Sequence, residues 1–347
     1  MGKRKTRGRL SGVSLVLNTM RRAENSTTPI TDKEPTLALE TATALDRSKR
    51  QKTETDGESE DTRKQSSQWV EKYDASGLVP HYTHASEVPE DLQKYFAQRE
   101  RYFSRYYKHP GCLLDREGWY SVTPELVADQ IAERCRCDTI LDAFCGVGGN
   151  AIAFAKTCQR VIALDTSPIR LALARHNAQI YGVADRIEFI LADYIAFAKA
   201  HTTLPHRRWK RQIDVIFLSP PWGGPSYLSG STLDSTDALS PLLGNLDDDA
   251  SAKDHPFYSL SSLQPINGSA LFNLSRQITH NIAYYLPRNT CLEEVAHLLE
   301  VCPDNVTGNA EPDVLEYVEV EEEWMGSKLK ALTCYFGGLV TDQEALF

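Results

Sequence analysis

The sequence predicts an α/β protein with a mostly parallel sheet of seven strands, and three observations support this class. Short apolar segments alternate with segments of helical period, which is typical of parallel strands joined by helices. A glycine-rich turn follows the first of these strands, as at ligand-binding sheet edges. The last two apolar segments are separated by three residues, which indicates an antiparallel hairpin. A chain of 347 residues that is 41% hydrophobic can bury a sizeable core.

Residues 1–75 are predicted to be a disordered polar tail. They are rich in Ser, Thr and charged residues, nearly lack aromatics, and show no sustained apolar period, so they cannot bury enough surface to offset chain entropy. Three basic clusters lie in this tail, at 3–9, 21–22 and 47–52. They are candidates for nuclear import or weak RNA attraction, and a solvated tail without either role is an equal alternative.

Residues 76–117 are predicted to be a helical N-terminal extension that contributes to the substrate site. Aromatic residues between Lys94 and Lys108 recur at spacings of seven and four, which places them on one helical stripe. Cations at 94, 101, 105 and 108 repeat beside it. A core-facing stripe with a solvated flank is the simpler interpretation. A basic face beside aromatics near an active site can also hold phosphates and a base.

The catalytic domain is predicted to span 118–347. Parallel strands are expected at 139–144, 160–165, 187–193, 213–220 and 282–287. Helices are expected at 167–182, 269–281 and 290–300, the last opened by Thr290 as N-cap. Strands at 314–324 and 328–337 complete the sheet as an edge hairpin. Two loop insertions, 201–212 and 228–268, interrupt this layout, and the longer is either disordered or a lid.

Composition excludes several classes of protein. The net charge of −9 argues against a protein that coats nucleic acid, although local patches can still hold RNA. The eight cysteines form no C-x-x-C pair and no Cys/His spacing suited to zinc, so we expect reduced thiols and no metal site. No apolar run approaches the roughly 20 residues of a membrane helix, and no signal-peptide core follows the basic N-terminus. We therefore expect an intracellular protein with no membrane contact.

The segment DAFCGVGGNA at 142–151 predicts a nucleotide-type cofactor loop. Gly146 and Gly148 let the backbone approach a ligand, and the following helix offers free amides. The loop also satisfies the dinucleotide pattern G-x-G-x-x-A, so by itself it leaves a dehydrogenase open. Asp142 would repel a pyrophosphate, however, and suits the cationic cofactor S-adenosylmethionine. Asp165 ends the second strand, where it can accept both ribose hydroxyls, and Asp193 follows the third, within reach of an adenine amine.

The fourth strand ends in Ser219-Pro220-Pro221-Trp222, a pattern found in methyltransferases that act on a planar amino group. The two prolines rigidify the turn, so that the Ser219 side chain and the Pro220 carbonyl can both accept hydrogen bonds from an NH2 group. Such bonds would aim the nitrogen lone pair at the methyl group. Trp222 would stack on the substrate ring. A proline-rich turn with a buried tryptophan is the alternative, which the glycine loop and the edge acids make less favourable.

Four motifs together resemble the trimethylguanosine synthase family, the RNA cap hypermethylases. They are LDREGWYSVTPE (114–125), DAFCGVGGN (142–150), SPPWGGPSY (219–227) and YLPRN (285–289), and the similarity runs from about Lys94 to Gly338. The resemblance implies a Rossmann-like S-adenosylmethionine-dependent methyltransferase fold. It also implies methylation of the exocyclic N2 of the 7-methylguanosine cap of small nuclear and nucleolar RNAs, giving 2,2,7-trimethylguanosine.

The resemblance also implies roles for individual residues. Trp222 would stack on the base while Ser219 and Pro220 orient the amine, and Asn177 would also lie at the base. Lys94, Tyr227 and Arg288 would meet the cap phosphates. Cofactor contacts would come from Thr123, Asp142, Gly146, Gly148, Asp165 and Asp193, with Phe103 and Tyr120 closing over the site. Two departures are the long 228–268 segment and the added basic loop 205–211, which either contacts RNA beyond the cap or is simply solvated.

The implied partners are capped small nuclear or nucleolar RNA and the RNP core proteins that deliver it. We expect a monomer in the nucleus, including the nucleolus, with some presence in the cytoplasm. Two alternatives stay open at this point. An adenine-N6 or glutamine-amide methyltransferase would share the Ser-Pro-Pro-Trp chemistry, and a non-catalytic RNA-binding platform would share the fold.

Overall fold

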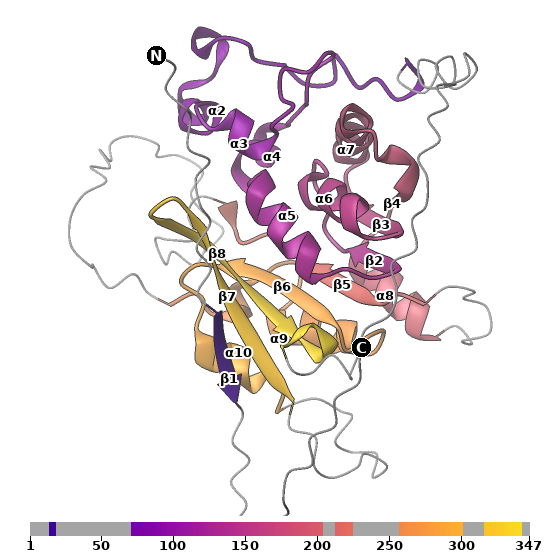
Figure 1. The fold of residues 1–347 in the computed structure, drawn as a ribbon, viewed down its shortest axis with the longest axis vertical. Helices are drawn as coiled ribbons and strands as arrows, with labels where there is room; N and C mark the ends of the chain where they lie inside the picture. The colour runs from indigo at the N-terminus through magenta and orange to yellow at the C-terminus, as the bar shows by residue number, and fades with distance from the viewer. Residues whose placement is uncertain (1–13, 19–70, 204–211, 225–256, 301–315, 342–347) are drawn as a thin grey trace, which may run out of the picture. The chain divides into compact units, whose positions relative to one another are not determined.

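An eight-stranded sheet forms the centre of the fold (Figure 1). The computed structural model describes residues 71–203, 212–224, 257–300 and 316–341, and the main chain of 14–18. The strands are β1 (Ser14–Asn18), β2 (Thr139–Asp142), β3 (Arg160–Asp165), β4 (Ile187–Leu191), β5 (Val215–Leu218), β6 (Ile282–Pro287), β7 (Tyr317–Met325) and β8 (Lys328–Phe336). Their order is β1-β7-β8-β6-β5-β2-β3-β4. The five strands from β6 to β4 pair in parallel, and β8, β7 and β1 are antiparallel additions.

The predicted fold class is confirmed by this sheet. All seven expected strands are present, and the hairpin of β7 and β8 turns at Gly326, whose φ is 66°. Strands 160–165 and 282–287 match their predicted bounds, whereas β4 and β5 end earlier, at Leu191 and Leu218. Strand β1 is the addition: it pairs with β7 and makes the hairpin an inner part of the sheet and not its edge.

Strand β1 corrects the prediction of a uniformly disordered tail. Residues 14–18, SLVLN, contain a short apolar run that the polar composition of the surrounding tail conceals. The far end of the tail also belongs to the folded body, because Ala75 is buried and its amide donates to His176 Nδ1 over 3.1 Å. The three basic clusters lie outside the described residues.

Helices cover both faces of the sheet (Figure 1). On one face lie α5 (Glu125–Arg134), α6 (Gly149–Thr157) and α7 (Pro168–Tyr181), and on the other α8 (Tyr194–Thr203), α9 (Gly268–Arg276) and α10 (Leu292–His297). Alternation along β3 explains the two layers: Val161 and Ala163 join the first apolar cluster, whereas Ile162 and Leu164 join the second. A strand buried on both faces therefore appears in the sequence as a continuous apolar run.

Helix α7 lies within one residue of its predicted bounds, 167–182, at each end, because its sequence carries signals at both ends. The Ser167 hydroxyl accepts a hydrogen bond from Arg170 N over 3.3 Å, and Gly182 ends the helix with φ 71°. The prediction that Thr290 caps α10 is wrong. That helix begins at Leu292, and the Thr290 hydroxyl instead donates to Pro287 O over 2.7 Å.

The two predicted loop insertions are only partly described. Residues 201–203 belong to α8, a helix that the sequence analysis did not predict, and residues 204–211 lie outside the described part of the chain. In the second insertion, residues 257–268 form a packed segment that contains the short 3-10 helix η6 (Leu260–Ser262). Tyr258, Leu260 and Leu263 are buried there, so this portion is anchored to the core and is not disordered.

The N-terminal extension contains short helices and not one long helix. Its elements are η1 (Ala85–Glu87), η2 (Glu90–Leu92), α2 (Gln93–Phe96) and α3 (Arg99–Tyr102), and α4 (Arg116–Ser121) begins at its end. The single helical stripe expected between Lys94 and Lys108 is therefore wrong. The amides of Ser104 and Arg105 donate to Glu125 Oε2 and Tyr181 Oη, at 2.5 and 3.3 Å, so tertiary partners replace helical ones.

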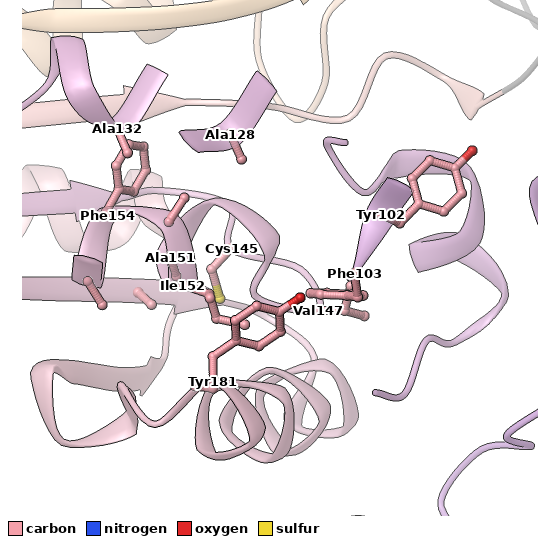
Figure 2. Close-up of a cluster of buried hydrophobic side chains, with 14 of the residues drawn as sticks. Tyr102, Phe103, Ala128, Ala132, Cys145, Val147, Ala151, Ile152, Phe154 and Tyr181 are labelled. Carbon is pink, nitrogen blue, oxygen red and sulfur yellow. The ribbon is translucent and has the colours of Figure 1, made fainter. Parts of the chain in front are cut away.

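Aromatic residues of this extension pack into the core, as the simpler interpretation of the stripe predicted. Figure 2 shows Phe103, Val147 and Tyr181 in one buried cluster, in which Val147 comes from the predicted cofactor loop. The Phe103 and Tyr181 ring centroids are 6.1 Å apart. The extension therefore fixes the loop through shared apolar contacts. Within the described residues, no group of His, Cys, Asp or Glu suits a metal ion, and no helix is long and apolar enough to cross a membrane.

Candidate active site

The structure brings the two predicted motifs together at a switch in strand order. Strand β2 lies between β3 and β5, so the chain runs outward from β2 in both directions, and ligands of open α/β sheets bind beside the carboxyl ends at such a point. Asp142 is the register partner of Phe217, two residues before Ser219. The Ser219 hydroxyl donates to Phe144 O over 3.4 Å. The glycine loop and the Ser-Pro-Pro-Trp turn are therefore neighbours.

The glycine loop has the geometry of a ligand cradle. Gly146 has φ 52°, and a Cβ added there would meet nothing within 4 Å, so the backbone borders open space. Gly148 serves packing: its φ is 90°, and an added Cβ would lie 3.0 Å from Ala174 Cβ on α7. A side chain at Gly148 would push α6 away from α7. The two glycines thus have different functions, one facing the site and one closing the helices.

Asp165 organises the loop from the end of β3. Its carboxylate accepts hydrogen bonds from Gly146 N at 3.0 Å and from Ser167 N at 2.7 Å. Arg170 Nη1 lies 3.9 Å from Asp165 Oδ1, and the same guanidinium pairs with Asp115 and Glu117 of the α4 segment. Arg170 therefore connects the N-terminal extension to the cofactor edge. The sequence analysis missed this residue, because a charge one turn into a helix usually indicates only a solvated face.

Asp142 is a buried carboxylate at the base of the site. It has no exposed surface, and the hydrogen bond that Oδ1 accepts from Phe144 N is long, at 3.4 Å. Its Oδ2 has no hydrogen-bond partner among the described residues. Burial, together with the nearby Asp165 charge, raises the pKa of Asp142 to about 7. A buried carboxylate of this kind is stabilised by a hydrogen-bond donor or a cation. The positively charged amino group of S-adenosylmethionine would supply both.

Of the other predicted cofactor residues, Thr123 and Asp193 lie near the ends of the parallel strands, whereas Tyr120 contacts the N-terminal extension. Thr123 is buried, and its hydroxyl accepts a hydrogen bond from Asn150 Nδ2 over 3.0 Å, beside the start of α6. Asp193 is exposed after β4, and its Oδ1 accepts from Ala196 N over 2.8 Å in the first turn of α8. Tyr120 on α4 donates to Asp91 and packs edge-on against Tyr95, with ring centroids 5.0 Å apart.

Aromatic rings pack together at the Ser219–Trp222 turn, where the methyl-accepting base is predicted to bind. The Trp222 ring lies over Tyr285 of β6, with centroids 5.3 Å apart and planes inclined by 31°. Tyr285 in turn lies 6.2 Å from Phe217 of β5. Trp222 is only partly buried, so it combines a supported ring with access to solvent. This is the arrangement that a base-stacking platform needs. Tyr285 was missed as a support, because its position behind Trp222 arises only from the pairing of β5 and β6.

No contact joins the residues that are predicted to bind the cap phosphates, within the part of the chain that the structure describes. Lys94 is exposed, and its Nζ lies 5.1 Å from the centroid of the Tyr95 ring. Arg288 follows β6 and is partly buried, and its Nη1 donates to Leu329 O over 3.4 Å. Tyr227 lies outside the described residues. These three assignments stay predictions.

Asn177 and Phe103 lie elsewhere than the sequence analysis expected. Asn177 has no exposed surface, and its amide bonds Leu113 N and O at 2.8 and 2.9 Å and Val147 O at 3.0 Å. It fixes the glycine loop to the N-terminal extension and has no open face toward a base. Phe103 is 2% exposed and packs in the core beneath the loop, so it does not cover the site (Figure 2).

Comparison with known proteins decides the family. A sequence profile of the RNA cap guanine-N2 methyltransferases matches residues 137–246 and 250–339. Trimethylguanosine synthase from Schizosaccharomyces pombe is 37% identical over 237 residues, which cover 65% of this chain and 83% of the relative. The chain belongs to the RNA cap guanine-N2 methyltransferase family. It is an S-adenosylmethionine-dependent enzyme that methylates cap guanine N2, and RNA is its substrate.

Two further similarities each cover less of the matched protein. Trimethylguanosine synthase from Saccharomyces cerevisiae is 36% identical over 156 residues, 44% of this chain and 48% of the relative. A putative methyltransferase from Porphyromonas gingivalis W83 is a solved structure with TM-score 0.42 and 12% identity, covering 80% of this chain and 58% of that one. The family assignment rests on the sequence matches and not on this structure. These sequence matches do not favour an adenine-N6 or glutamine-amide methyltransferase, and they do not favour a non-catalytic platform.

Proposed function

We propose that this cap methyltransferase acts on 7-methylguanosine caps of small nuclear and nucleolar RNAs and adds two methyl groups to N2, giving 2,2,7-trimethylguanosine. The observation that carries the proposal is the pair formed by the Ser219–Trp222 turn and the glycine loop, which meet at the Ser219 to Phe144 hydrogen bond. A planar base on Trp222 would hold its exocyclic amine next to the cofactor edge.

Ser219 and Pro220 would orient the amine. The Ser219 hydroxyl directs its hydrogen to Phe144 O, so its oxygen keeps lone pairs for an incoming NH2 group. The Pro220 carbonyl supplies a second acceptor on a backbone that two prolines make rigid. Two acceptors would align the amine lone pair with the methyl group, a positioning effect worth up to roughly 7–11 kcal/mol in favourable cases. Ser219 is a weak base, so the amine proton would pass to solvent.

The cofactor would occupy the carboxyl edge of the sheet. S-adenosylmethionine supplies a methyl group bonded to a positively charged sulfur. Asp142 would neutralise the charged amino-acid end, Asp165 would accept from the ribose, and Asp193 would meet the adenine amine. Thr123, Gly146, Gly148 and Tyr120 complete the set that we propose around it. Gly146 fits this role because a ligand can approach its backbone without meeting a side chain.

Trp222 would select the cationic base. A guanine methylated at N7 carries a positive charge, and a cation over a tryptophan face gains about 1–3 kcal/mol from cation–π and stacking effects. Lys94, Arg288 and Tyr227 would bind the cap phosphates around it. The N-terminal extension 76–117 would thus contribute to the substrate site, and 118–347 would form the catalytic domain.

Trp222→Ala tests this proposal. Trp222→Ala should reduce turnover of a 7-methylguanosine cap nucleotide at least tenfold, whereas its affinity for S-adenosylmethionine should stay within about twofold of wild type. The affinity of wild type and of Trp222→Ala for S-adenosylmethionine is measured by titration calorimetry. Turnover is measured by transfer of a labelled methyl group to the cap nucleotide. Loss of cofactor binding would make Trp222 a structural residue. Wild-type enzyme that methylates unmodified guanosine nucleotide equally well would contradict selection by charge.

The proposed setting is the nucleus, including the nucleolus, where such RNAs would be delivered by RNP core proteins to a monomeric enzyme. The acidic net charge of −9 supports delivery by a partner, because it gives little general attraction to RNA.

A further inference from the structure

Trp222 lies between two prolines, which restrict the main chain, and two glycines, which allow it more conformations. Pro220 and Pro221 precede it and restrict the chain. Gly223 and Gly224 follow it, with φ 92° and 70°, and an added Cβ on either would meet nothing within 4 Å. Neither glycine therefore has a side chain that could hold the peptide after Trp222. A side chain from another segment can restrain this peptide.

Tyr258 supplies such a restraint from 36 residues further along the chain. Its phenol donates to Trp222 O over 3.2 Å. Burial raises the pKa of Tyr258 to about 12, so the phenol keeps its proton and stays a donor across the range in which enzymes work. The carbonyl that accepts belongs to the peptide between Trp222 and Gly223. Its orientation sets where the tryptophan side chain leaves the turn.

The Tyr258 backbone is itself firmly attached. Its N donates to Asn289 O over 2.8 Å, and its O accepts from Cys291 N over 3.0 Å, which makes a parallel bridge with Thr290. These partners directly follow Arg288, which we propose to meet the cap phosphates. The next residues are also fixed, since Leu260 N donates to Glu294 Oε2 of α10 over 2.6 Å. Tyr258 therefore transmits the position of the end of β6 to the Trp222 turn.

We propose that Tyr258 is a positioning residue for cap binding. It acts through the Trp222 carbonyl, while Tyr285 supports the Trp222 ring from behind at 5.3 Å. Tyr258 therefore restrains the main chain of Trp222, and Tyr285 supports one face of its ring. The inference rests on the proposed role of Trp222 as the base-stacking platform. It adds a specific consequence: removal of one hydroxyl that touches neither substrate nor cofactor weakens selection of the base.

Tyr284→Phe provides a matched control for Tyr258→Phe. The Tyr284 phenol is also buried and donates to a backbone carbonyl, Gly268 O, over 3.3 Å. Tyr284 belongs to the apolar cluster on the α9 face of the sheet, as part of the structural core. Each variant loses one phenol-to-carbonyl hydrogen bond of similar length, so both should lose similar stability. Only Tyr258→Phe alters the turn that carries Trp222.

The experiment compares wild type, Tyr258→Phe, Tyr284→Phe and Trp222→Ala in the full chain. The probes are 7-methylguanosine 5′-diphosphate and S-adenosylhomocysteine for binding, and a 7-methylguanosine-capped RNA with S-adenosylmethionine for turnover. We expect Tyr258→Phe to raise KM for the cap about three- to tenfold and to reduce its preference over unmethylated guanosine. S-adenosylhomocysteine affinity should stay within twofold, and Tyr284→Phe should match wild type in every binding measurement.

Two results would overturn the inference, and they are distinguishable. If Trp222→Ala abolishes cap turnover while Tyr258→Phe and Tyr284→Phe have the same KM, then Tyr258 has only a structural role and the proposed function stands. If Trp222→Ala retains full cap turnover, Trp222 is not the base-stacking platform and the role of Tyr258 fails with it, whereas methylation of the cap itself still stands. A shift in KM and base preference confined to Tyr258→Phe supports the inference, because lost stability alone would appear in both tyrosine variants.

Discussion

The Asp142 carboxylate has the most unusual environment in the site. It combines complete burial, one weak hydrogen bond and an oxygen without a partner among the described residues. A pKa raised from 3.8 to about 7 means that the folded protein holds this proton more tightly than the unfolded chain. Its contribution to stability is therefore present below pH 4 and is lost as the pH rises to about 7. A bound cation would reverse the preference and favour the ionised carboxylate.

Cofactor affinity should accordingly depend on pH. Because the cation binds the ionised carboxylate, affinity for S-adenosylmethionine should rise about tenfold between pH 6 and pH 8, from deprotonation around pH 7. In Asp142→Asn, which has similar shape but no charge, affinity should be weaker and this pH dependence should disappear. Titration calorimetry at both pH values measures the change. A wild-type affinity that is flat over this range would show that Asp142 is already ionised without ligand.

The positions of site residues could be predicted from sequence where a local motif carries them. Asp142, Gly146 and Ser219 lie at one edge of the sheet, as the strand ends and the turn that carry them predicted, and their roles stay proposals. The prediction that Asn177 lies at the base was wrong and Tyr258 was not predicted, because their hydrogen bonds join segments 64 and 36 residues apart in the chain. No local pattern marks such a partner.

At the level of elements, helix α6 depends on a close approach to α7. Gly148 is the N-cap of α6 and has a left-handed backbone, and Ala174 of α7 lies where its side chain would be. The sequence predicted this turn correctly, since strand, glycines and apolar helix are contiguous. It did not predict that α3 ends at Tyr102, just before Ser104 and Arg105. There, tertiary hydrogen bonds to Glu125 and Tyr181 outweigh a helical period that is locally consistent.

Gly148→Ala should therefore destabilise the protein more than Gly182→Ala does. Both positions have positive φ, 90° and 71°, so both variants incur backbone strain of about 1 kcal/mol. Only at Gly148 would the new methyl group crowd a neighbour, at 3.0 Å, which adds roughly 1–3 kcal/mol. Urea unfolding of the two variants gives both free energies. Equal losses would mean that α6 and α7 separate at little cost.

The whole molecule is organised by its strand order. Two apolar layers, one on each face of the sheet, fix the ends of β2 and β5 side by side, so the methyl donor and the amine can meet at one edge. The alternation of apolar strands and helices predicted this sheet, because each buried strand is a continuous apolar run. Strand β1 escaped prediction, since five residues in a polar tail carry too weak a signal until β7 supplies a partner.

Identification of the methylated atom tests the proposed activity most directly. The full chain is incubated with S-adenosylmethionine and an RNA that carries a 7-methylguanosine cap, and the digested nucleosides are resolved by mass spectrometry against synthetic standards. The proposed function predicts 2,7-dimethylguanosine followed by 2,2,7-trimethylguanosine, with no methyl on internal bases, and at least tenfold slower formation of both products by Trp222→Ala. Methyl groups found on adenine, or on guanosine that lacks the N7 methyl at the same rate, would contradict the central claim.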